Sequence, residues 1–139
     1  MKKQKEPIII DLMSSPRAVR DLYNSGYHGR LLAVGFNDFR TTMERKNDAE
    51  HNISFIKGDL AKSDTFKQIQ QWLGDKKAHL IMERGFAGLH FIPTRLNYQK
   101  AVLSKFWDMI DPEGGLMVLQ KIYFTINYPL FSIIRASSF

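Results

Sequence analysis

Four segments of the chain carry polar or acidic side chains directly after a short apolar run. They span residues 11–17, 35–38, 58–60 and 83–88. If each apolar run is a strand of one parallel sheet, the four segments meet at the edge where such sheets bind ligands. Carboxylates at that edge accept hydrogen bonds from ribose hydroxyls or from a ligand amine. The pattern therefore favours a neutral or zwitterionic, nucleoside-like ligand.

Other kinds of site are disfavoured by what the sequence lacks. Neither GxGxxG nor GxxxxGK[ST] is present, so a phosphate cradle is not expected. There is no cysteine, which excludes a disulfide framework, a thiolate metal site and a cysteine nucleophile. The four histidines have no metal-ligand spacing, and His90 alone is placed to act as a general base. No base partner is identifiable for Ser14 or Ser15, so serine hydrolase chemistry is disfavoured.

Five short apolar runs predict the strands that position these segments. Each is too continuous to alternate between a wet and a dry face, apart from the third, which we expect at a sheet edge. The predicted strands are Ile8–Leu12, Leu31–Phe36, Ile53–Ile56, Ala78–Glu83 and one starting at Leu116.

Helices are predicted between the strands. Pro16 stands at the first position of the first helix, with Ser15 as its cap. A short helix is expected around Thr42–Lys46, and stronger apolar periodicity predicts helices over Asp64–Leu73 and Leu96–Ile110. Strands alternating with helices predict an α/β, Rossmann-like, doubly wound and mostly parallel sheet of about five to seven strands with flanking helices.

Length and composition point to a single domain spanning residues 1–139, with its core at about 7–121. The chain has 139 residues, 44% of them hydrophobic, and a net charge of +6. No apolar run approaches the length of a membrane span, and the basic start lacks a signal core. We expect a soluble, cytoplasmic protein without a membrane partner. The positive charge permits an anionic partner such as RNA without requiring one.

The last 18 residues, 122–139, break the alternation of strands and helices. They are rich in aromatic and β-branched residues, and Asn127–Pro129 forms a turn signal in their middle. We expect either an extended fifth strand with a returning strand, or an apolar surface that awaits a partner.

The order and spacing of residues 7–121 resemble the class I S-adenosylmethionine-dependent methyltransferases. The resemblance rests on the strand motifs IIIDL, LAVGFN, FIKGDL and HLIME and on IDPEGGLMVL, which is similar to the family's LxPGG approach to the fifth strand. Gly58-Asp59-Leu60 resembles the family's adenine-contacting turn. The resemblance implies S-adenosylmethionine as cofactor and methyl transfer to an unidentified acceptor. No metal is implied.

The resemblance also implies a role for each matching residue. The cofactor's methionine part would lie against the first loop, its ribose against the end of the second strand, and its adenine against the third. The implied cofactor-binding residues are Asp11, Leu12, Ser14, Ser15, Asn37 or Asp38, Asp59 and Leu60, and the implied acceptor-facing, catalytic residues are Glu83, Arg84 and His90.

Three features depart from the family pattern. The first loop, Asp11–Arg17, has no glycine, whereas the family pattern is DxGxGxG. Gly35 stands where the family has an acidic residue that holds the ribose hydroxyls. Only residues 122–139 remain for the family's last two strands, so the fifth strand could be left partly uncovered.

These departures support a second hypothesis, from a different class. The chain is then a catalytically silent methyltransferase fold that acts as an interaction or dimerisation module, with a homodimer formed through the C-terminal segment. RNA binding driven by the positive charge is a third, weaker hypothesis.

Overall fold

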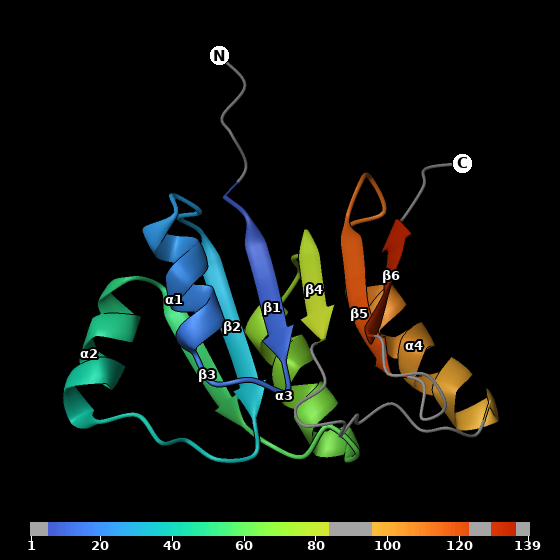
Figure 1. The fold of residues 1–139 in the computed structure, drawn as a ribbon, viewed down its shortest axis with the longest axis horizontal. Coiled ribbons are helices and arrows are strands. Elements are labelled where there is room, and N and C mark those ends of the chain that lie inside the picture. Colours follow the sequence, from blue (N-terminus) through green and yellow to red (C-terminus); the bar gives the residue numbers. More distant parts are fainter. Residues whose placement is uncertain (1–5, 84–95, 123–128, 136–139) are drawn as a thin grey trace.

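The computed structural model describes residues 6–83, 96–122 and 129–135. Strands and helices alternate along the chain as far as the fifth strand, and the next described element is a sixth strand (Figure 1). The elements are β1 (Ile8–Leu12), α1 (Arg17–Asn24), β2 (Arg30–Gly35), α2 (Thr42–Glu50), β3 (Ile53–Lys57), α3 (Ser63–Leu73), β4 (Leu80–Glu83), α4 (Leu96–Met109), β5 (Leu116–Ile122) and β6 (Pro129–Arg135).

The strands form one sheet in the order β3-β2-β1-β4-β5-β6. The first five are parallel and β6 runs antiparallel to β5. Strand order reverses between β1 and β4, so the carboxyl ends of these two strands flank the switch point. The predicted α/β class, the mostly parallel sheet and the edge position of the third strand are confirmed.

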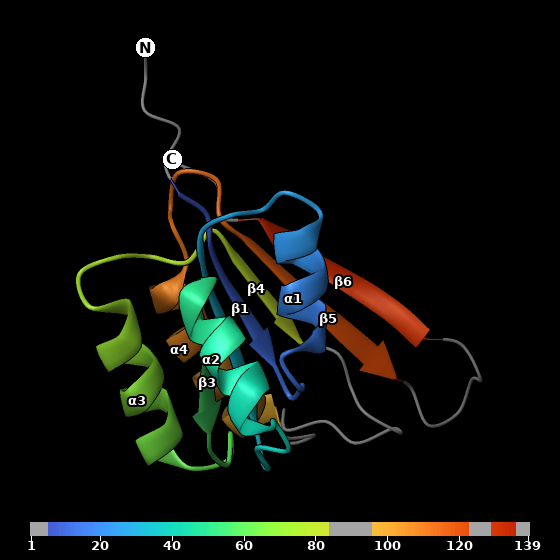
Figure 2. The ribbon, with the colours of Figure 1, turned by 90° about the vertical axis from the view of Figure 1, so that its left-hand side faces the viewer.

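Helices cover both faces of the sheet. Figures 1 and 2 show α1 and α2 over the β1–β3 side of one face, with α3 and α4 on the other. The larger core cluster lies under α3 and α4 and includes Ile10, Phe66 and Phe106, all buried. A smaller cluster joins Val19 of α1 to β1, β2 and β3. Burial of β1 on both faces explains its continuous apolar run.

Two local predictions are corrected. The first helix begins at Arg17 with Pro16 as its N-cap, and no side chain caps it, so Ser15 is not the cap. The second helix starts at Thr42 as predicted, with a capping box formed by Thr41 and Glu44, but it extends to Glu50 rather than ending near Lys46.

In the C-terminal segment the structure shows the extended fifth strand with a returning strand, and Asn127 and Tyr128 of the predicted turn lie outside the described residues. β5 extends to Ile122, and β6 pairs with it along seven residues, from Leu116 opposite Arg135 to Ile122 opposite Pro129. The fifth strand is therefore paired on both sides, and β6 forms the edge of the sheet. None of the helices in the described ranges is long and apolar enough to cross a membrane.

Candidate functional site

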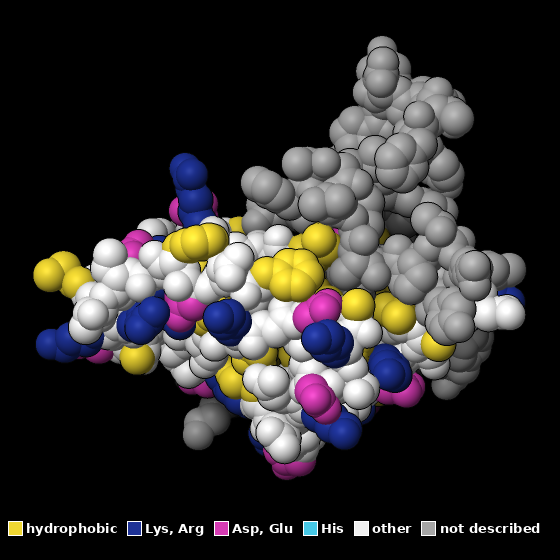
Figure 3. All heavy atoms as spheres, turned by 90° about the horizontal axis from the view of Figure 1, so that it is seen from below, with side chains coloured by type: hydrophobic (Ala, Val, Ile, Leu, Met, Phe, Trp, Pro, Cys, Tyr) yellow, Lys and Arg dark blue, Asp and Glu magenta, His cyan; other side chains and the backbone are white. Residues whose placement is uncertain are grey.

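The parallel register brings the carboxyl ends of β1, β2, β3 and β4, each of which leads into one of the predicted segments, to one edge of the sheet. Leu12 of β1 lies opposite Val34 of β2 and Glu83 of β4, and Gly35 lies opposite Lys57 of β3. Figure 3 looks onto this carboxyl edge and shows hydrophobic, basic and acidic side chains intermingled across it.

The first loop is fixed by hydrogen bonds of its own residues. The Ser14 hydroxyl lies 2.5 Å from Oδ2 of the buried Asp11 and 2.6 Å from the Ser15 carbonyl oxygen. The Ser14 amide donates to the Val34 carbonyl at 3.1 Å, which ties the loop to β2. Met13 has a φ of 59°, a left-handed conformation that glycine adopts more readily. The loop therefore makes its turn without glycine, at the cost of backbone strain at Met13.

The position of Ser14 disfavours any side chain at position 35. A Cβ atom on Gly35 would lie 2.6 Å from the Ser14 carbonyl oxygen, closer than side chains approach backbone atoms. The loop thus occupies the space into which an acidic side chain at position 35 would project.

Asp38 is already held by arginine. Arg40 Nε lies 2.8 Å from Asp38 Oδ1, Arg40 Nη2 lies 2.9 Å from Oδ2, and the Arg40 amide donates to Oδ1 at 3.1 Å. Arg45 adds an ion pair at 3.4 Å. The neighbouring Asn37 is exposed.

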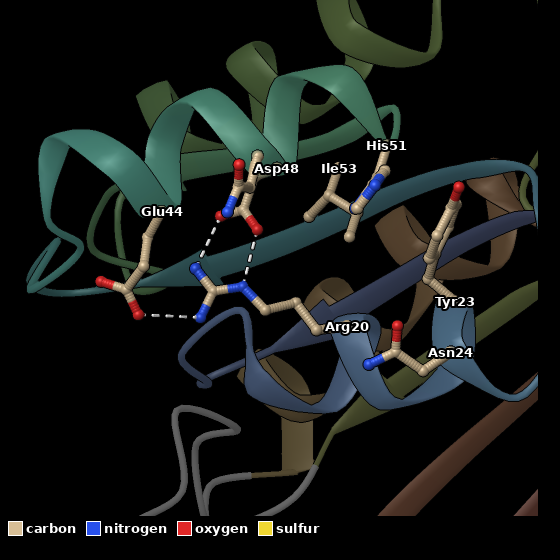
Figure 4. A pocket seen from close by; sticks show the side chains of 8 residues that line it. Arg20, Tyr23, Asn24, Glu44, Asp48, His51 and Ile53 are labelled. Carbon is tan, nitrogen blue, oxygen red and sulfur yellow. Dashed lines mark hydrogen bonds and ion pairs between the residues drawn. The ribbon is translucent and has the colours of Figure 1, made fainter.

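Asp48 on α2 joins this pair to α1. Its carboxylate, 2% exposed, accepts from Arg20 Nε at 2.6 Å, Arg20 Nη2 at 2.8 Å and Arg40 Nη1 at 3.1 Å. We call Arg20, Asp38, Arg40 and Asp48 the arginine–aspartate cluster. Figure 4 shows the Arg20 end, where the guanidinium bridges Asp48 and Glu44 beside a cavity of about 230 Å³ between α1 and α2.

The third-strand turn keeps one carboxylate at the edge. Asp59 Oδ1 accepts from the Ala61 amide at 2.9 Å, and the Asp59 carbonyl accepts from the Thr65 hydroxyl at 2.7 Å. The Asp59 side chain is half-buried, while Leu60 packs into the larger core cluster. These two bonds tie the turn to Ala61 and to Thr65 of α3.

The predicted acceptor-facing residues are only partly described. Glu83 is buried and, from the strand alternation, faces the α3 and α4 side with Ile81, whereas Asp11 faces the α1 side. Arg84 and His90 lie outside the described residues. The structure therefore brings Asp11, Ser14 and Ser15 together, places Asn37, Asp38 and Asp59 along the same edge, and sets Glu83 on the opposite face.

The arginine–aspartate cluster was not foreseen from the sequence. Arg20 and Asp48 are 28 residues apart, and no local pattern links them. The Thr41-x-x-Glu44 capping box could have shown where α2 starts and hence that Asp48 lies on a helix. Within the described ranges, no group of three or more His, Asp or Glu side chains could hold a metal ion.

A second hollow, of about 860 Å³, lies at the amino ends of the strands and is lined by both acidic and basic residues. His79 contributes to it, and its Nδ1 accepts from the Ile8 amide at 2.9 Å. That bond fixes the start of β1 at the edge opposite the candidate site.

The cluster makes stability sensitive to acid. Hydrogen bonds from Arg40 lower the pKa of Asp38 from 3.8 to about 2. Burial raises the pKa of Asp48, but hydrogen bonds from Arg20 and Arg40 outweigh it, so that pKa is also lowered. Because these folded-state pKa values are depressed, the ionised carboxylates stabilise the fold above pH 3.8 and lose this contribution as the pH falls toward 2.

We therefore expect the free energy of unfolding to fall between these two pH values, and to fall less steeply in an Asp38→Asn variant. Urea titrations at a series of pH values measure this. A control variant at the exposed Asp75 should keep the profile of the unchanged protein. An Asp38→Asn profile that matches the unchanged protein would contradict the expectation.

Comparison with known proteins identifies the fold. No family model and no curated protein matches this chain. Among solved structures, the glycopeptide N-methyltransferase MtfA complexed with S-adenosylmethionine superposes with a TM-score of 0.52 at 10% identity, over 98% of this chain and 62% of MtfA. WbdD, co-crystallised with the kinase inhibitor LY294002, superposes with a TM-score of 0.53 at 16% identity, over 88% of this chain and 26% of WbdD. The chain thus spans less than two thirds of either neighbour, and at these identities the likeness shows the fold alone. The chain has a methyltransferase-like α/β fold.

Proposed function

We propose that the chain binds S-adenosylmethionine at the carboxyl edge of its sheet and transfers the cofactor's methyl group to an acceptor. The observation that supports this most is the sheet itself. Its order reverses between β1 and β4, and the neighbour MtfA, which has the same kind of fold, was solved with S-adenosylmethionine.

The residues at the edge fit this ligand at the adenine end. Asp59 Oδ1 caps the Ala61 amide, and a carboxylate has a second oxygen that can accept the exocyclic amine. Asp11, Leu12, Ser14 and Ser15 form the loop against the methionine part. Asp11 and Leu12 are fully buried, so their side chains shape the loop, and the Ser14 and Ser15 backbone is the part that can approach the ligand.

Methyl transfer requires mainly that the protein position the acceptor and the methyl group. S-adenosylmethionine carries an activated methyl group on a sulfonium, so the protein has to hold acceptor and methyl in line and exclude water. Glu83, Arg84 and His90 are our proposed acceptor-facing residues.

Asp59→Ala is expected to weaken S-adenosylmethionine binding by about 1.5–3 kcal/mol, the contribution of a hydrogen bond to a charged group. Isothermal titration with S-adenosylmethionine and S-adenosylhomocysteine measures it. Asp59→Asn keeps an oxygen for the Ala61 amide, so it separates loss of the ligand contact from collapse of the turn. Asp64→Ala, at an exposed carboxylate on α3, is the matched control and should leave the affinity unchanged. Equal affinities for Asp59→Ala and the unchanged protein would remove Asp59 from the site.

The second candidate function is a silent fold that dimerises through its C-terminal segment. Strand β6 lies at the sheet edge and its sequence is apolar, and such an edge is a template for pairing with another chain. Light scattering over a range of concentrations tests this. A strict monomer that binds S-adenosylmethionine rules it out, whereas a dimer that binds neither ligand supports it.

A further inference from the structure

From Asn37 to Thr41, the side chains between β2 and α2 alternate in burial. Asp38 and Arg40 are half-buried, while Asn37, Phe39 and Thr41 are exposed. This is the alternation of an extended chain, in which successive side chains point to opposite sides. Phe39 is 86% exposed, an unfavourable position for a large apolar side chain. Something other than burial of Phe39 therefore fixes the segment.

Arg40 is the residue that fixes it. Its side chain is 12% exposed and bonds both carboxylate oxygens of Asp38 as well as Oδ2 of Asp48. Its guanidinium carbon also lies 5.0 Å from the centre of the Phe55 ring on β3. One side chain thus joins the segment to α2 and to β3. The planar guanidinium makes these contacts in one geometry, which lysine cannot reproduce.

The hydrogen bonds from Arg40 to Asp38 also determine which side chain of the segment is available to contact a ligand. Both oxygens of Asp38 accept from Arg40, and Arg45 lies 3.4 Å from Oδ2. Turning the carboxylate toward a ligand would break this bidentate pair. Asn37, on the other side of the extended chain, is exposed and carries both a donor and an acceptor, which suits a pair of hydroxyls.

We propose that Arg40 is a positioning residue that fixes residues 36–41 so that Asn37, rather than Asp38, contacts the hydroxyls of the bound ligand. This assignment rests on the proposed S-adenosylmethionine site. It explains how the chain replaces the acidic residue that Ser14 excludes from position 35.

Two measurements on the full chain test the proposal. Amide hydrogen exchange of the ligand-free protein reports on residues 36–41, and isothermal titration gives the affinity for S-adenosylmethionine. In Arg40→Ala we expect exchange in this segment to rise, and affinity to fall, by about tenfold or more. Added methylguanidinium should partly restore both the slow exchange and the affinity of Arg40→Ala. A variant that is only generally destabilised would not be rescued in this way. Should Arg40→Ala fail to fold, Arg40→Lys keeps the charge without the bidentate geometry and should show the same two changes.

Three further variants separate the roles. Asn37→Ala should weaken binding without changing exchange, because it removes a ligand contact only. Asp38→Asn should raise exchange, and any loss of affinity should follow from that. Arg45→Ala is the matched control, since Arg45 is 55% exposed and has a single long ion pair to Asp38. It should leave both readouts within about twofold of the unchanged protein.

Each contrary result would refute one stated part of the proposal. Unchanged affinity in Arg40→Ala and Arg40→Lys, or unchanged exchange, refutes the positioning role. An Asp38→Asn variant that binds weakly while its exchange is unchanged assigns the hydroxyls to Asp38 and refutes the role of Asn37. If the unchanged protein binds neither S-adenosylmethionine nor S-adenosylhomocysteine, the proposed function is wrong and the ligand role of Asn37 falls with it. The exchange data then decide alone whether Arg40 fixes the segment.

Discussion

Asp48→Ala is expected to lower the free energy of unfolding by about 3–5 kcal/mol, the usual cost of removing one partner from a buried ion pair. Asp48 accepts three hydrogen bonds, two from Arg20 and one from Arg40, and is 2% exposed. Its loss leaves two half-buried guanidinium groups facing each other without the carboxylate between them. The two arginines then repel each other, and of the Arg20 bonds to α2 described above only the one to Glu44, at 3.2 Å, remains.

Urea unfolding at neutral pH measures this effect. Asp48→Asn keeps the shape and one acceptor oxygen, so it should cost less than Asp48→Ala. Asp75→Ala removes a carboxylate that is 88% exposed and 3.9 Å from Lys76, and it should change stability by less than about 0.5 kcal/mol. A loss below 1 kcal/mol in Asp48→Ala would mean that solvent reaches the cluster and that its bonds add little.

The sequence was a good guide to the sheet because the burial of parallel strands leaves a direct mark on composition. Ile8–Leu12 is buried at every position, and four of its five residues are apolar, the exception being Asp11. The third strand has one buried residue, Ile53, and its weaker pattern matched its place at the edge. In both cases the pattern reflects how many faces of the strand are covered.

The second helix was underestimated for the opposite reason. Residues 42–50 bury only Asp48, so apolar periodicity is almost absent from them. The helix is stabilised by its capping box and by the bond of Asp48 to Arg20. Ion pairs between residues 28 positions apart depend on how the chain folds back, and no spacing rule gives them.

The candidate site was predictable in place and less so in detail. The carboxyl ends of parallel strands meet at one edge whatever the side chains, so Asp11, Asn37 and Asp59 were expected near one another. Two details could not be predicted, because they depend on side-chain geometry. Arg40 already bonds the Asp38 carboxylate, and Glu83 is buried on the other face of the sheet. The absence of an acid at position 35 was visible in the sequence, but its cause, the Ser14 carbonyl, lies 21 residues away along the chain.

Gly35→Asp places an acidic residue where the class I methyltransferases have one. It is expected to destabilise the fold by about 3 kcal/mol without improving S-adenosylmethionine binding. The added Cβ would lie 2.6 Å from the Ser14 carbonyl oxygen and 3.4 Å from the Phe55 ring. The obstructing atom belongs to the backbone of a loop that is tied to Val34 and Asp11, so it has little room to move. The carboxylate would also enter a buried position beside a carbonyl oxygen, which cannot donate to it.

Asn37→Asp is the control that separates the effect of adding a carboxylate from the effect of the steric clash at position 35. It supplies a carboxylate at the same strand end, at an exposed position, and should leave stability nearly unchanged. Gly35→Ala isolates the steric part and should cost about 1–3 kcal/mol. Thermal and urea unfolding, with titration of S-adenosylmethionine, distinguish the three variants. A stable Gly35→Asp protein that binds S-adenosylmethionine more tightly would contradict this expectation. It would show that the first loop can move aside to admit a side chain at position 35.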